Sequence, residues 1–252
     1  MPVRERFSHD PGRVSSRKTS RACSQRISEQ ETPASKSEGP LIEAYDEALL
    51  MLRTSHRMFD AAAALHAEGA METDIYERDR QLDRYVRSVR RRIVTHMSVS
   101  SKPDINLGLV LTAIVIDIER IGDYTKNISE IASAVDGPLD GLELHDELLA
   151  IERVLGQMFD DVGPALEGSD EDRARTILEA HSVVAEKVDQ HVRSLAAGEA
   201  LSGRAGHAVT VALYLRFLKR VSAHLKNVAT SVVNPQPRIG YREKESEDTR
   251  VE

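Results

Sequence analysis

The stretch LGLVLTAIVIDIERIGDYTKNISE, residues 107–130, decides the fold of this chain. Its first half is apolar at almost every position, which predicts a long helix that begins in a core. Glu119 and Asp123 stand four residues apart, so they lie on one face of that helix. Two carboxylates at this spacing repel each other unless a cation lies between them. The pair therefore indicates either a solvated surface or half of a cation site.

Helical periodicity continues on both sides of this stretch. Apolar residues recur at alternating steps of three and four, as along the seam of a helical bundle. A glycine and proline pair at 163–164 is expected to close the fourth helix, and Asn234-Pro235 the sixth. The apolar seams lie within about 41–69, 75–93, 103–134, 144–162, 177–192 and 209–233.

The composition narrows the class of protein. Of the 252 residues, 4% are aromatic and none is Trp, which favours helix over sheet. The single cysteine, Cys23, excludes an internal disulfide and a cysteine-based metal site, and this fits a reducing cytosol. The longest apolar run is too short to span a bilayer, and the N-terminus has no hydrophobic signal region. We expect a cytoplasmic protein.

Charge and composition set the N-terminal arm apart. Residues 1–40 hold 8 Lys and Arg against 5 Asp and Glu, a net charge of +3, so the other residues hold 26 against 36, a net of −10. This arm is rich in Ser, Arg, Glu and Pro and lacks apolar periodicity, so we expect it to be disordered. A basic arm on an acidic body suggests an anionic partner, or nothing beyond solubility.

The two halves of the remaining chain resemble each other. A shift of 100 positions places IERIGDYTKNIS (118–129) over LKRVSAHLKNVA (218–229), and Arg, Lys and Asn recur at three matching positions. We therefore predict an all-α fold of two tandem three-helix bundles, a duplicated arrangement, after a disordered N-terminal arm. The carboxylates are lost in the second copy, where Lys219 and Ala223 stand. The predicted boundaries are 1–40 for the arm, 41–137 and 138–233 for the bundles, and 234–252 for a charged tail.

Further acidic residues lie on the second helix. Asp79 occupies a seam position, where an ionised carboxylate is costly unless it is paired or bound to a metal, and Asp83 follows one turn later. If this helix lies beside the third, the acids could converge on one cation that prefers oxygen ligands. The alternatives are that Asp79 pairs with Arg120 or lies at a hydrated bundle end. His56 could be a further ligand or a hydrogen-bonded core residue.

No sequence motif supports catalysis. The chain has no glycine-rich phosphate loop, no nucleophile elbow and no Cys–His pairing, so no catalytic residue is assigned. A metal-dependent phosphohydrolase stays an alternative, as does a helical adaptor whose acidic residues are only solvated. Few aromatic residues and no recognition motif are present, so nucleic-acid binding is not expected.

The segment IERIGDYTKNISE resembles the signature of the PhoU family of phosphate-uptake regulators. The matching positions are Glu119, Asp123 and 127–130, and ERDRQLDRYV (77–86) resembles the family's acidic second helix with Asp79 and Asp83. The resemblance extends over about residues 41–233 and is weak in the second repeat. The entry to the third helix, SVSSKPDINLGL (98–109), departs from the family pattern, which suggests a divergent branch.

The resemblance implies a non-enzymatic regulator of phosphate uptake and phosphate-responsive signalling. It implies contact with a phosphate transporter, a membrane sensor kinase or both, so the membrane is met only through protein partners, and homodimerisation is left open. It also implies a divalent or multinuclear metal, often iron, for which Glu119, Asp123, Asp79 and Asp83 are the expected ligands. Alternatives are an adaptor without metal and a regulator of a different, non-ABC phosphate transporter.

Overall fold

The computed structural model describes residues 39–68, 74–133, 144–201 and 205–241. These residues form six α-helices and one short 3-10 helix, with no strand among them. Residues 1–38 of the predicted disordered arm, residues 134–143 between the two bundles and residues 242–252 of the charged tail lie outside the described residues. The helices are α2 (Pro40–Glu68), α3 (Ile75–Val99), α4 (Ile105–Ser133), α5 (His145–Gly168), α6 (Glu171–Ala197) and α7 (Ala205–Val233), followed by η1 (Gln236–Arg238).

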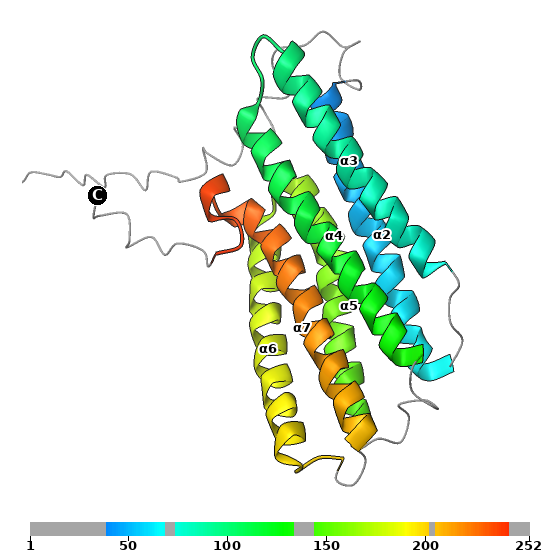
Figure 1. The fold of residues 1–252 in the computed structure, drawn as a ribbon. Helices are drawn as coiled ribbons and strands as arrows, with labels where there is room; N and C mark the ends of the chain where they lie inside the picture. The colour runs from blue at the N-terminus through cyan, green and yellow to red at the C-terminus, as the bar shows by residue number, and fades with distance from the viewer. Residues whose placement is uncertain (1–38, 69–73, 134–143, 202–204, 242–252) are drawn as a thin grey trace, which may run out of the picture. The chain divides into compact units, whose positions relative to one another are not determined.

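The helices pack as the predicted pair of three-helix bundles. Helices α2, α3 and α4 contact one another, as do α5, α6 and α7. The two sets meet through α4 against α7 and α2 against α5, and Figure 1 shows α4 and α7 side by side. The helices thus confirm the all-α fold class, and the domain boundaries stay a prediction.

Each bundle is held by an apolar seam that matches its sequence period. Leu82, Val89 and Ile93 of α3 are at most 6% exposed, and α7 buries residues at the same spacing. Burial of each large aliphatic side chain contributes about 1.5–3 kcal/mol. This packing, rather than helix propensity, fixes which face of each helix points inward.

Two expectations about individual elements are wrong. Helix α5 continues through Gly163-Pro164 and ends at Gly168, because Ala165 is fully buried and its packing offsets the backbone hydrogen bond that a proline removes. Leu109 and Ile116 were expected in the core but are 47% and 40% exposed. They lie seven residues apart, so they share the side of α4 that faces away from the core.

No helix in the part of the chain that the structure describes has a stretch long and apolar enough to cross a bilayer.

Candidate functional site

The predicted acidic residues lie where α3 and α4 pack together. Asp79 on α3 accepts a hydrogen bond from the Lys126 ammonium on α4, with 2.7 Å between Oδ2 and Nζ. Both side chains are 21% exposed. Asp79 therefore has a charged partner, but the partner is Lys126 and not Arg120 as one alternative had it.

Asp123 lies beside the same lysine. Its Oδ1 is 3.6 Å from Lys126 Nζ, and its Oδ2 accepts a hydrogen bond of 2.9 Å from Arg120 Nη1. Burial by itself would lower the pKa of the Lys126 amine, but the hydrogen bond and charge of Asp79, with the charge of Asp123, raise it. Lys126 is therefore held as a cation between the two helices.

Glu119 and Asp83 form the outer part of the group. Glu119 is 26% exposed, and its Oε2 lies 3.8 Å from Arg120 Nε. Burial raises the pKa of the Glu119 carboxyl, and the charges of Asp123 and Asp83 raise it further, whereas Arg120 and Arg90 lower it. The four predicted ligands thus lie in one region, interleaved with cationic side chains.

This arrangement does not fit a metal ion. Among the described residues, no three His, Cys, Asp or Glu side chains are grouped closely enough to hold one. The oxygens of Asp79 and Asp123 face the nitrogens of Lys126 and Arg120, and a hard cation would need those oxygens for itself. Metal binding and the identity of the metal stay predictions of the sequence.

The second bundle has different residues at the positions of the four acidic side chains. Gly122 lies against Leu82, and its counterpart Ser222 hydrogen-bonds His181 at 3.0 Å. The buried residues of the two helices set a shift of 102 between α3 and α6, which places Ile75, Leu82, Val86 and Ile93 on Ile177, Val184, Val188 and Leu195. At this shift, Asp79 and Asp83 correspond to the non-acidic residues His181 and Ala185. All four acidic positions are thus replaced in the second bundle, which extends the loss seen at Lys219 and Ala223.

A second polar cluster, not expected from the sequence, joins the two bundles. Asp117 on α4 contacts two side chains of α7: its Oδ1 is 2.6 Å from His224 Nδ1 and accepts a 2.9 Å hydrogen bond from Asn227. Asp117 is 18% and His224 13% exposed. The sequence did hold a sign of this cluster: Asp117 is a lone carboxylate that follows the apolar run of α4, and a half-buried carboxylate needs a polar partner.

The equivalent pair of positions in the α4–α7 junction is occupied by aromatic side chains instead of polar ones. The shift of 100 converts Asp117 and His224 into Phe217 and Tyr124, whose ring centroids are 5.9 Å apart. Arg220 donates a 3.0 Å hydrogen bond to the Tyr124 hydroxyl and lies 5.2 Å from the ring centre. The junction is therefore built from matching positions of the two repeats, with a carboxylate and a histidine at one and two aromatic rings at the other.

His56 also lies between the bundles. Its ring stacks on Phe159 of α5 at a centroid distance of 4.7 Å, and its nitrogens lie 3.5 Å from Asp60 and 4.0 Å from Asp160. It is remote in sequence from α4 and contributes to the contact of α2 with α5. The structure does not place it with Glu119 or Asp123.

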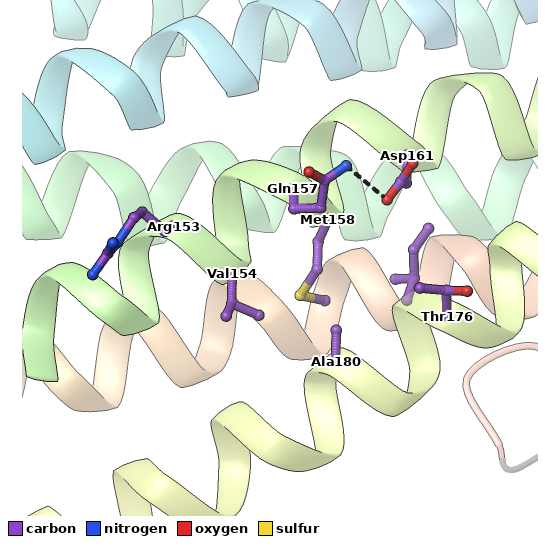
Figure 2. Close-up of a pocket in the computed structure, with 8 residues that line it drawn as sticks. Arg153, Val154, Gln157, Met158, Asp161, Thr176 and Ala180 are labelled. Carbon is purple, nitrogen blue, oxygen red and sulfur yellow. Dashed lines mark hydrogen bonds between the residues drawn. The ribbon is translucent and has the colours of Figure 1, made fainter.

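A pocket of about 240 Å³ lies between α5 and α6. Figure 2 shows Met158 and Ala180 directed toward each other, with Gln157 and Asp161 hydrogen-bonded beside them. Asp161 is further paired with Arg173 at 2.8 Å. Val154, Met158, Ile177 and Ala180 give the pocket an apolar floor.

Comparisons with known proteins agree with the fold. Residues 41–132 match the family model described as PhoU domain. A relative from Synechocystis sp. (strain ATCC 27184 / PCC 6803 / Kazusa), named "Phosphate-specific transport system accessory protein PhoU homolog", is 26% identical over 172 residues, which cover 66% of this chain and 75% of that protein.

Two solved structures are similar to the whole helical body. PhoU from Pseudomonas aeruginosa gives a TM-score of 0.69 at 20% identity, over 77% of this chain and 95% of that one. The phosphate transport system regulatory protein PhoU from Streptococcus pneumoniae gives 0.68 at 13% identity, over 77% and 93%. At these identities the structures show a shared fold. The match of residues 41–132 to the PhoU domain model, the Synechocystis relative and the shared fold together confirm the resemblance of the chain to the PhoU family.

Proposed function

We propose that this protein regulates phosphate transport and phosphate-responsive signalling by protein contact in the cytoplasm, without catalysis. The observation that carries the proposal is the match of residues 41–132 to the PhoU domain model, on a fold shared with PhoU proteins. The Synechocystis relative is named as an accessory protein of a phosphate-specific transport system. The expected partner is a phosphate transporter, a sensor kinase or both.

The surface of α4 and α7 supports action by contact. Leu109 and Ile116 on α4 are 47% and 40% exposed, and Val209 and Leu213 on α7 are 60% and 44% exposed. These helices adjoin each other and belong to different bundles. The two helices run antiparallel, because Asp117 meets His224 and Tyr124 meets Phe217, so the exposed pairs lie toward opposite ends of this surface. An elongated surface with exposed aliphatic side chains at both ends suits contact with a partner protein.

Loss of the protein in its native cell tests the regulatory role. Cells that lack it should take up more phosphate than the parent strain when phosphate is abundant, and the wild-type gene should restore the parental rate. Uptake that is unchanged by the loss would contradict a regulatory role.

Co-purification tests the contact. A tagged full-length protein should retain phosphate-transporter or sensor-kinase subunits, identified by mass spectrometry, and a Leu109→Ser/Val209→Ser variant should retain fewer. Leu149→Ser on α5 is the matched control, because Leu149 is 37% exposed on a helix outside this surface. Equal recovery with all three proteins would remove α4 and α7 from the contact. Recovery of neither partner class would contradict the contact itself.

A further inference from the structure

The acidic group of the first bundle contains its own cation. We infer that Lys126 is the resident cation of Asp79, Asp123 and their neighbours, and that the group is an ion-pair network that ties α3 to α4 in place of a metal centre. This inference does not depend on the proposed function, because it concerns what holds the bundle together.

Three of the carboxylate oxygens that a metal would use already face cationic side chains. Lys126 Nζ is 2.7 Å from Asp79 Oδ2 and 3.6 Å from Asp123 Oδ1. The other carboxylate oxygen of Asp123 lies 2.9 Å from Arg120 Nη1. Charge-assisted hydrogen bonds of this length between partly buried groups are among the stronger polar contacts in proteins. A metal ion could bind here only after the lysine and arginine had moved away.

The second bundle has an α6–α7 ion pair of reversed sign, with a lysine at the position of Glu119. Lys219 donates to both oxygens of Asp189 at 2.6 Å. The shift of 100 makes Lys219 the counterpart of Glu119, and the shift of 102 makes Asp189 the counterpart of Arg87. Arg90, one turn further along α3, acts electrostatically on Glu119. An ion pair keeps its attraction when both signs are reversed. A metal-ligand position cannot accept an ammonium group, so the exchange favours a structural role for Glu119.

A charge-swap experiment tests this role directly. Glu119→Lys and Arg90→Asp, each made alone in the full-length protein, should lower the thermal unfolding midpoint. The double variant reverses both charges, so it keeps the attraction between the two positions and should recover most of the loss. A double variant no more stable than the worse single variant would overturn the inference for Glu119.

The resident cation is tested by removing it. Lys126→Ala should lower the midpoint by roughly 2–8 °C, because the partly buried Asp79 loses its ion-pair partner and Asp123 keeps only Arg120. Lys187→Ala is the matched control, since Lys187 is exposed on α6, and its midpoint should not change. A Lys126→Ala protein as stable as the wild type would overturn the inference.

Metal titration separates the two accounts of the site. The wild-type protein, stripped with a chelator and dialysed against Fe²⁺, Mn²⁺ or Zn²⁺, should keep its unfolding midpoint and retain less than one equivalent of metal by elemental analysis. A rise in the midpoint together with stoichiometric metal would show a true metal centre and overturn the inference. Neither result depends on phosphate uptake, so failure here and failure of the proposed function are distinguishable.

Discussion

Acidification should destabilise this protein through His181, a histidine that the α6–α7 contact holds neutral. Its Nδ1 lies 3.0 Å from the Ser222 hydroxyl. Burial, followed by the charges of Lys226 and Lys219, lowers the pKa of His181 from 6.5 to about 4. The unfolded chain therefore binds more protons than the folded one between these two pH values. His181 therefore does not reduce the free energy of unfolding above pH 6.5, and it lowers that free energy progressively as the pH falls from 6.5 toward 4.

The size of the effect follows from the two pKa values. At about pH 5 the unfolded histidine is almost fully protonated and the folded one almost neutral, which amounts to about 2 kcal/mol of lost stability. That is a large part of the 5–15 kcal/mol that separates most folded domains from their unfolded states.

A His181→Gln variant isolates this contribution. Glutamine can still hydrogen-bond Ser222 but does not titrate, so its free energy of unfolding should depend less on pH. Urea unfolding of both proteins at about pH 7.5 and pH 5 measures the difference, since every other titrating group is common to the two. If wild type and variant lose stability in parallel, His181 is not the source of the acid sensitivity.

Two further predictions concern packing and the junction between the bundles. Gly122→Ala should cost about 1–3 kcal/mol, because its Cβ would lie 2.3 Å from Leu82 Cδ1 in a filled core. Gly156→Ala, with nothing within 4 Å, should instead stabilise α5 by about 0.5–1 kcal/mol, and equal effects of the two would contradict the close approach. Asp117→Ala should cost about 1–3 kcal/mol in urea unfolding, because His224 loses its half-buried partner; an unchanged midpoint would show that the contact is dispensable.

Apolar spacing predicted the helices well because each one buries a continuous stripe. It failed at the end of α5, where the favourable burial of Ala165 in the core outweighs the local cost of Pro164. It also failed at Leu109 and Ile116, since a run of apolar residues does not itself show which side of the helix meets a neighbour.

The acidic site was predicted only in part. The positions of Glu119 and Asp123 on one face of α4 follow from helical spacing within a single segment. The partners of these carboxylates do not follow from spacing. Lys126 contacts Asp79 across 47 residues of sequence, and the helices carry both cations and anions on every side. Asp117 and His224 are 107 residues apart, and their contact depends on how two separately formed bundles meet.

The sequence by itself determined the class of the protein: helical periods set the six helices, and the internal match of 118–129 with 218–229 set the duplication. Only the tertiary structure decided what the acidic stripe at Glu119 and Asp123 faces. A carboxylate is compatible with a metal, with water or with an ammonium group, and the choice depends on which side chain the packing of α3 against α4 brings within about 3 Å. Here the packing brings Lys126 to Asp79 and leaves Asp123 between Lys126 and Arg120.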